Sequence, residues 1–210
     1  MCRRMVADRL VVGAAGNVSV RVDDLIAVTP TAVPYLAMTP ADVVLHRLSG
    51  EPTDEGRTAA GESGDPVREP TSEWPLHLAA YAARPEVGAV VHTHSVAATA
   101  LSCLVDEVPA VHYYLAMFGG SVRVAPYAEY GSDALAAGAV TALGGGTACL
   151  LGNHGAVTLG ASLDQAYDRA VYLEWLCEVA LRVLSSGRPA RVLNRADLDA
   201  IADRITAYGN

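Results

Sequence analysis

Four residues of this 210-residue chain have the types and local settings that suit a metal site. His92 and His94 are separated by one residue in an apolar run, and alternate side chains of a β-strand project to the same face. Glu73 falls in the first turn of a predicted helix, where the helix dipole favours a carboxylate, and His154 lies in a glycine-flanked turn. Three imidazoles and one carboxylate form a complete ligand set for Zn²⁺ or a neighbouring transition metal.

The histidine pattern also has plainer interpretations. An H-x-H pair is equally compatible with two hydrogen-bonded structural residues. His77 follows Glu73 by four residues on the same helical face, so it is a rival ligand, although a structural role is favoured. We expect His46 to be exposed, and His112 to pack against neighbours rather than line the site.

The chain contains no lysine, because all fifteen basic residues are arginine. This excludes Schiff-base chemistry on a protein amine, a standard P-loop and a pyridoxal phosphate linkage. Carbonyl chemistry in this protein would need another electrophile, and a metal ion is the obvious candidate. The net charge of −8 and pI near 5.1 argue against nucleic acid or an anionic membrane as a partner.

Length and composition predict one globular domain over residues 1–210. No apolar run reaches the length of a spanning helix and no secretory signal is visible, so we expect a cytoplasmic protein. The cysteines are scattered and are expected to be reduced thiols: Cys2, Cys103, Cys149 and Cys177.

Short strands joined by tight turns alternate with helices along the chain. Together they predict an α/β fold, a single-domain α/β/α sandwich with a mostly antiparallel central sheet. Residues 49–70 form a polar surface excursion, and residues 200–210 form a mobile C-terminal tail. The predicted strands cover 18–22, 25–28, 87–94, 122–125, 148–151 and 156–159, and the helices 71–84, 96–104, 132–143, 163–184 and 196–208.

Three polar segments have the composition of anion-binding loops. Gly16-Asn17 joins flexible backbone to a carboxamide, Thr31-Ala32 lies in a turn, and Thr71-Ser72 opens a helix whose first N–H groups are free. Each segment alone would be read as a turn or a cap. Their occurrence together, with Glu73 adjacent to one of them, is what favours a bound anion.

Taken together, these segments resemble the class II aldolase/adducin family. The likeness runs from Gly13 to the C-terminus. It rests on motifs in one order: Ala15-Gly16-Asn17-Val18-Ser19-Val20-Arg21, Thr29-Pro30-Thr31, Ser72-Glu73-Trp74, Tyr81 with Arg84-Pro85, Ala89-Val90-Val91-His92-Thr93-His94, Pro109-Ala110-Val111-His112-Tyr113, Ala125-Pro126-Tyr127-Ala128, His154-Gly155 and Tyr208-Gly209.

The resemblance implies specific roles. Zn²⁺, with Mn²⁺ or Co²⁺ as alternatives, would be held by Glu73, His92, His94 and His154. A fourfold homotetramer is implied, with active sites between subunits, where Tyr113 reaches into a neighbour's site and Tyr208 closes over it. The substrate phosphate would be held by Gly16, Asn17, Thr31, Ala32, Thr71 and Ser72, with Tyr130 at the aldehyde end.

The implied reaction is reversible cleavage of a ketose 1-phosphate, such as L-fuculose 1-phosphate or a 5-deoxypentulose 1-phosphate, to dihydroxyacetone phosphate and a small aldehyde. The metal would act as Lewis acid, Glu73 as general base and Tyr113 as general acid. The alternatives on this fold are a pentulose-phosphate 4-epimerase, in which aspartate is expected at position 73, a thio-sugar-phosphate dehydratase, and a non-catalytic adducin-like interaction module.

The sequence departs from the family pattern in several places. The N-terminal helix is shorter by a turn or more, and the segment 49–70 is longer. Ala32 replaces an expected glycine, Thr71 stands where serine is usual, and Tyr130 makes the aldehyde end more polar. These departures concern the identity of the sugar more than the reaction.

Overall fold

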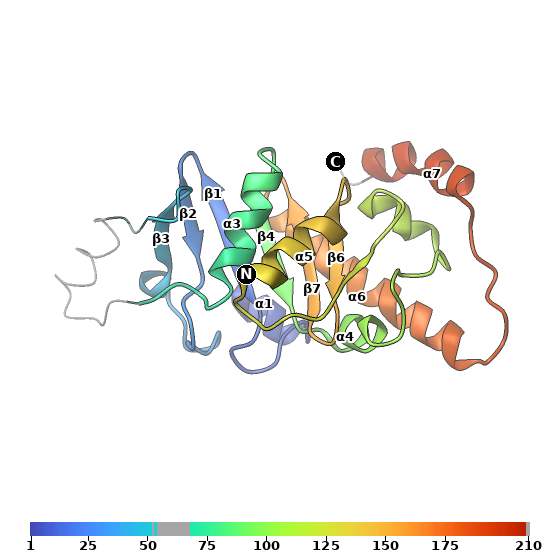
Figure 1. The fold of residues 1–210 in the computed structure, drawn as a ribbon, viewed down its shortest axis with the longest axis horizontal. Helices are drawn as coiled ribbons and strands as arrows, with labels where there is room; N and C mark the ends of the chain where they lie inside the picture. Colours follow the sequence, from blue (N-terminus) through green and yellow to red (C-terminus); the bar gives the residue numbers. More distant parts are fainter. Residues whose placement is uncertain (52, 54–67, 209–210) are drawn as a thin grey trace.

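In the computed structural model, residues 1–51, 53 and 68–208 are described, and a seven-stranded sheet lies at their centre (Figure 1). Its spatial order is β3-β2-β1-β4-β7-β6-β5, and every neighbouring pair is antiparallel except β5 with β6. The predicted mostly antiparallel sheet is therefore confirmed. The strands are β1 (Asn17–Val22), β2 (Leu25–Val28), β3 (Val44–Arg47), β4 (Ala89–Thr93), β5 (Val124–Ala125), β6 (Ala148–Leu151) and β7 (Gly155–Gly160).

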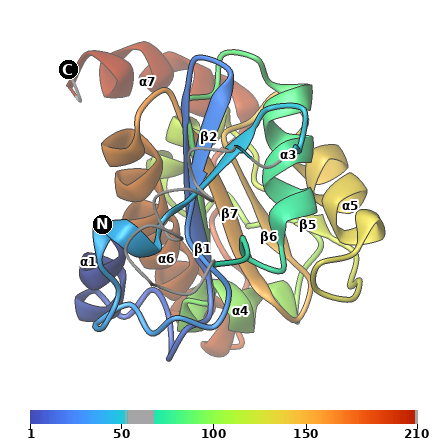
Figure 2. The same cartoon turned by 90° about the vertical axis from the view of Figure 1, so that its left-hand side faces the viewer.

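Helices cover both faces of this sheet, with α3 and α5 on one side and α1 and α6 on the other (Figure 2). The predicted α/β/α layering is thus confirmed. The helices are α1 (Cys2–Ala7), η1 (Pro40–Asp42), α3 (Trp74–Ala83), α4 (Val96–Ser102), η2 (Tyr113–Phe118), α5 (Asp133–Leu143), α6 (Leu163–Ser185) and α7 (Arg195–Tyr208).

Strand β4 shows how the core is divided between the two faces of the sheet. Val90 packs into the cluster that α3 and α5 cover, whereas Ala89 and Val91 pack against α1 and α6. All three are fully buried, and burying a valine side chain contributes about 1.5–3 kcal/mol. By the same alternation His92 projects to the side of Val90, toward the beginning of α3.

Several local expectations need correction or stay open. His46 was expected to be exposed, but it is buried, because β3 pairs it with Ile26 and its ring packs 5.1 Å from that of Trp74. Strand β4 ends at Thr93, so His94 follows the strand rather than closing it. All four cysteines are free, and Cys103 is exposed.

Parts of two predicted segments lie outside the described residues. Most of the polar excursion 49–70 does so, and so do residues 209–210 and the side chain of Tyr208. The backbone of the predicted tail is helical up to Tyr208 within α7, and its mobility stays a prediction. In the described part of the chain, no helix combines the length and apolar character needed to cross a bilayer.

Candidate metal centre

The strand register places His92 at the centre of the site. On β4, His92 pairs with Asn17 of β1 on one side and with Val157 of β7 on the other. The ring is fully buried, and its Nδ1 lies 2.9 Å from the carbonyl oxygen of Ala156. With Nδ1–H donated to that carbonyl, Nε2 is directed to the interior of the site.

His94, directly after β4, and His154, in the turn between β6 and β7, reach the same point. The backbone N–H of His94 donates to the carbonyl of Leu10 at 3.0 Å, which continues the extended path beyond β4. His154 lies in the β6–β7 turn, where Asn153 adopts a φ of 57°. Position 155 must be glycine, because a Cβ there would lie 2.0 Å from the carbonyl oxygen of Thr93. The glycine beside His154 therefore serves backbone packing rather than ligand access.

Glu73 is placed by the beginning of α3. It is the N-cap residue of that helix, Pro75 occupies the first turn, and the Glu73 N–H donates to Thr71 Oγ1 at 3.3 Å. The carboxylate is buried and faces the three imidazoles.

The predicted histidines and carboxylate converge closely. Ligand atoms of Glu73, His92, His94 and His154 all lie within 4.8 Å of one another. Nε2 of His94 lies 2.9 Å from Nε2 of His92 and 3.1 Å from Nε2 of His154, while the Glu73 oxygens lie 3.0 Å and 3.4 Å from His92 and His154. These atoms surround one point, which is the arrangement of a metal site with three histidines and one glutamate.

The electrostatics of the group favour a positive charge at that point. Burial opposes ionisation of Glu73, but His92, Asn17 and His154 outweigh it and hold the carboxyl pKa well below its usual range. Burial would also lower the pKa of His92, yet the Glu73 carboxylate raises it overall. Burial, His92 and His154 lower the pKa of His94 to about 4, so this ring stays neutral, as a metal ligand must be.

One buried atom supports the fit of a divalent ion directly. Among the described residues, Glu73 Oε1 is the buried side-chain atom left without a hydrogen-bond partner. His154 Nε2 lies 3.4 Å from this oxygen without forming a hydrogen bond to it. A buried carboxylate oxygen without a hydrogen bond costs folding free energy unless a cation or another donor meets it. The donor set of three imidazoles and one carboxylate suits Zn²⁺ and neighbouring transition metals.

The other two histidines considered as site residues lie outside this group. His77, the rival ligand, is fully buried and uses both ring nitrogens, with Nδ1 2.7 Å from Ser19 Oγ and Nε2 2.6 Å from Asn17 Oδ1. The ring of His112 stacks on Tyr113 with centroids 4.4 Å apart and meets Trp175 edge-on at 4.8 Å. His112 is therefore a packing residue, as favoured from the sequence.

A pocket of about 330 Å³ opens beside the four ligands, within the usual size of a small-molecule site. Glu73, His94 and His154 line it, while His92 lies behind them. The residues that the sequence suggested for substrate all line it too: Gly16, Asn17, Thr31, Ala32, Thr71, Ser72 and Tyr130.

Long-range backbone contacts assemble the three polar loops. An isolated bridge joins Pro30 to Pro70, and the N–H of Thr71 donates to the carbonyl of Thr29 at 3.0 Å. Two loop residues have left-handed backbones: Gly16 with a φ of 76°, where a Cβ would lie 2.8 Å from the His92 carbonyl oxygen, and Ala32 with a φ of 57°. Among the described residues that line the pocket there is no arginine, so backbone N–H groups, hydroxyls and a metal would have to hold an anion.

Of the predicted catalytic residues, Glu73 lines this pocket. Tyr113 begins η2, is exposed and does not line it, and the side chain of Tyr208 lies outside the described residues. Sequence reasoning missed Tyr127 and Asn153 as lining residues. The neighbouring Tyr130 and His154 were the signals that would have pointed to them.

Comparison with known proteins agrees with this architecture. The family described as "Class II Aldolase and Adducin N-terminal domain" matches residues 1–181. The L-fuculose phosphate aldolase of Escherichia coli (strain K12) is 36% identical over 209 residues, covering 99% of this chain and 92% of that protein. The 5-methylthioribulose-1-phosphate/5-deoxyribulose-1-phosphate aldolase of Rhodospirillum rubrum is 37% identical over 199 residues, covering 94% and 84%. A solved structure of an L-fuculose 1-phosphate aldolase is similar at a TM-score of 0.88 and 31% identity, covering 98% of this chain and 92% of that one. The chain belongs to the class II aldolase/adducin family.

Proposed function

We propose that this class II aldolase reversibly cleaves a ketose 1-phosphate to dihydroxyacetone phosphate and a small aldehyde, with Zn²⁺ as its cofactor. One observation carries the proposal. The pocket lies beside the group formed by Glu73, His92, His94 and His154. The same pocket is also lined by loops suited to an anion. The chain also lacks lysine, so it has no side-chain amine for Schiff-base chemistry.

The loops supply the contacts for the phosphate. Backbone N–H groups of Gly16, Ala32 and Ser72 and the hydroxyls of Thr31, Thr71 and Ser72 would surround it, with the carboxamide of Asn17 beside them. An arginine-free pocket holds the phosphate through directed hydrogen bonds. This arrangement fixes the position of the substrate's first carbon relative to Glu73.

Glu73 has the setting of a general base as well as a ligand. Asn17 Nδ2 donates to its Oε2 at 2.8 Å, while Oε1 has no hydrogen-bond partner among the described residues. Displaced from the ion when substrate binds, Oε1 would remove a proton from the dihydroxyacetone carbon in the condensing direction and return it during cleavage. The bound dication would supply Lewis acidity, stabilising the negative charge that develops as the carbon–carbon bond breaks.

The aldehyde end would be bounded by Tyr130, with Tyr127 next to it. Both tyrosines are exposed at the pocket, so their hydroxyls would meet a short polar aldehyde. We propose L-fuculose 1-phosphate or a 5-deoxypentulose 1-phosphate as the substrate. Relatives named for fuculose phosphate and for deoxyribulose phosphate support the two choices about equally, at 36% and 37% identity.

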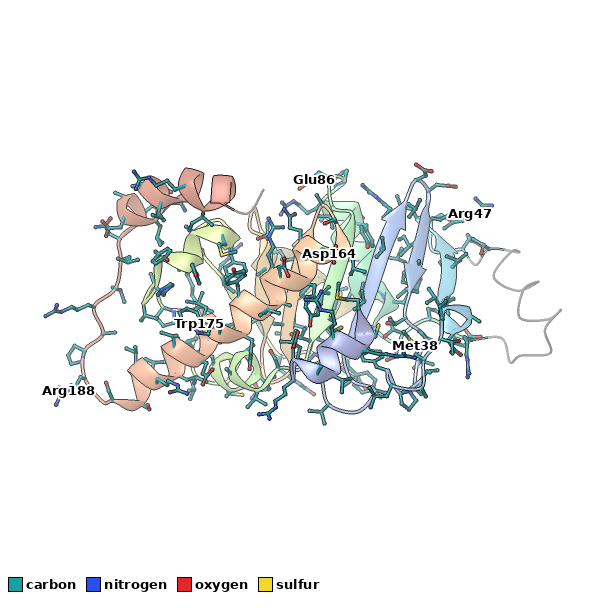
Figure 3. The ribbon with its side chains drawn as sticks, turned by 180° about the vertical axis from the view of Figure 1, so that it is seen from behind. Met38, Arg47, Glu86, Asp164, Trp175 and Arg188 are labelled. Atoms are coloured by element: carbon teal, nitrogen blue, oxygen red, sulfur yellow. The ribbon has the colours of Figure 1, made fainter. Side chains whose placement is uncertain are left out.

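The general acid would come from a second subunit. Tyr113 is exposed outside its own pocket and belongs to a cluster of rings with His112, Tyr114, Tyr172 and Trp175. Trp175 projects from α6 on the rear face (Figure 3) and is 42% exposed, and exposed aromatic residues of this kind are enriched at subunit interfaces. We propose a homotetramer in which Tyr113 serves a neighbour's site and Tyr208 closes over it.

A coupled assay for dihydroxyacetone phosphate tests the reaction. Fuculose, rhamnulose, ribulose and 5-deoxyribulose 1-phosphates should be compared, with metal content measured on the same sample to separate Zn²⁺ from Mn²⁺ and Co²⁺. Release of dihydroxyacetone phosphate from at least one ketose is expected. An epimerase or a dehydratase would convert substrate without releasing it, and an interaction module would convert nothing.

Subunit sharing has a separate test by complementation. Glu73→Gln and Tyr113→Phe chains should each be inactive, but hybrid assemblies of the two would contain some sites with both native residues. Activity should therefore return when the chains are unfolded together and refolded as a mixture. No recovery in hybrids of confirmed tetrameric size would show that Tyr113 acts in its own subunit or not at all.

A further inference from the structure

A ladder of buried polar side chains joins β1 to α3 beneath the metal centre. Glu73 at the N-cap of α3 is followed at intervals of four by His77 and Tyr81 within the helix, and Asn17 and Ser19 alternate on β1. Four helical residues rise about 6 Å and two strand residues about 6.6 Å, so the two series stay in step. Each rung is therefore a short, direct contact.

The contacts are continuous from one end to the other. Tyr81 Oη lies 2.9 Å from Ser19 Oγ, which lies 2.7 Å from His77 Nδ1. His77 Nε2 lies 2.6 Å from Asn17 Oδ1, and Asn17 Nδ2 lies 2.8 Å from Glu73 Oε2. His77 is fully buried, and burial lowers its pKa to about 3, so the ring is neutral.

The Glu73 carboxylate determines the direction of every donor in this ladder. A carboxylate only accepts, so Asn17 must present its amide N–H₂ to Glu73 and its oxygen to His77. His77 must then donate from Nε2, which leaves Nδ1 to accept from the Ser19 hydroxyl. Ser19 in turn accepts from Tyr81.

We infer that His77 is a positioning residue for the metal centre, because its Nε2–H fixes the Asn17 carboxamide that holds Glu73 Oε2 and leaves Oε1 for the ion. With the His77 hydrogen bond removed, the Asn17 carboxamide is free to rotate. Glu73 then loses the donor that orients it. Outer partners of metal ligands usually control affinity in this way, at a cost of about 10- to 100-fold when they are removed.

Two substitutions at position 77 separate this role from packing. In His77→Gln the side-chain amide nitrogen falls near the place of Nε2, so it still donates to Asn17. In His77→Asn the shorter side chain reaches Ser19 but not Asn17. Zinc affinity should be measured by chelator competition on metal-free protein, with circular dichroism to establish that each variant is folded.

We expect His77→Asn to raise the Kd for Zn²⁺ by about 10- to 100-fold and His77→Gln to stay close to the unchanged protein. Ser19→Ala should have a smaller effect, because it leaves the contact between His77 and Asn17 in place. Equal affinity in His77→Asn and the unchanged protein, or equal loss in both His77 variants, would overturn the inference.

A measurement on the unchanged protein keeps the inference testable if the variants do not fold. Nitrogen-15 NMR of labelled histidine should show the assigned His77 ring as the neutral Nε2–H tautomer. The Nδ1–H tautomer would overturn it. This inference rests on the metal site proposed above, but the two fail differently: unchanged protein that binds no Zn²⁺ contradicts the site, whereas normal binding with the wrong tautomer contradicts only the role of His77.

Discussion

The pocket has two halves that are built in opposite ways. The metal half consists of Glu73, His92, His94 and His154, and the side chains of His92, Glu73 and His154 are 0%, 6% and 10% exposed. The anion half consists of the loop residues Gly16, Thr31, Ala32, Thr71 and Ser72, of which Thr31, Ala32 and Ser72 are exposed.

The difference separates metal binding from anion binding. The metal half uses side chains attached to the core, so metal binding depends on strand register and on buried hydrogen bonds. The anion half uses loop backbone and short hydroxyl side chains, which can change without disturbing the core. Asn17 belongs to both, since it lines the pocket and donates to Glu73. Changes in the metal half should alter metal affinity, whereas changes in the anion half should alter the KM for substrate.

The largest expected effect comes from Glu73→Gln. The variant loses both a charged ligand and the base, so turnover should fall by about 10³-fold or more. Hydrogen exchange on dihydroxyacetone phosphate, followed by NMR in deuterated water, should become undetectable. Glu69→Gln, an exposed acid four residues earlier, is the matched control and should exchange normally. Full exchange in Glu73→Gln would remove Glu73 from the role of base.

Ser72→Ala is the corresponding change in the anion half. Losing one hydrogen bond to a charged phosphate costs about 1.5–3 kcal/mol, which corresponds to a rise in KM of roughly 10- to 100-fold. Zinc affinity should be unchanged, because Ser72 is absent from the ligand group. A loss of zinc affinity equal to the rise in KM would show that the halves are not separable. Ser185→Ala, at the exposed end of α6, is the control.

The buried His77 beneath the metal half should also make stability depend on pH. Burial lowers the pKa of His77 to about 3, while an unfolded histidine titrates near 6.5. Between these values the unfolded chain binds the extra proton, so the free energy of unfolding falls as the pH falls.

For one group the slope is about 1.4 kcal/mol per pH unit. Urea unfolding of the metal-free protein between pH 6 and 4 should therefore show a steeper fall in the free energy of unfolding than urea unfolding of His77→Gln. The difference between the two slopes should be close to that expected for one proton. Equal slopes in the two proteins would mean that His77 is already protonated in the folded state.

The smallest effect is expected from Ala32→Gly. Ala32 has a φ of 57°, in the left-handed region that disfavours a side chain. Glycine should raise the free energy of unfolding by about 0.5–1 kcal/mol, measured by urea denaturation. Ala37→Gly, whose backbone does not have a positive φ, should lower it. A destabilised Ala32→Gly would show that the exposed loop carries no strain.

Local pattern was sufficient to predict much of this molecule. The alternation of side chains around His92 and the β6–β7 hairpin, whose turn ends at Gly155, depend only on neighbouring residues. The structure has both. The departure at Ala32 was also visible, because an alanine in place of glycine falls where the backbone is left-handed.

What the sequence did not reveal depends on pairings between distant segments. His46 is buried because β3 aligns with β2 and brings it under Trp74. The contact of Ser19 with His77 joins residues 58 positions apart, and no local rule indicates it. Asn17 was predicted as an anion ligand, but its donation to Glu73 follows from the position of α3 over β1.

The central claim is that one dication is bound among Glu73, His92, His94 and His154. Anomalous diffraction at the zinc edge, from crystals grown with Zn²⁺, tests it most directly. We expect one peak per chain, about 2.0–2.2 Å from the three histidine nitrogens and a Glu73 oxygen. Density without a peak at this point, with the four side chains turned apart, would contradict the account.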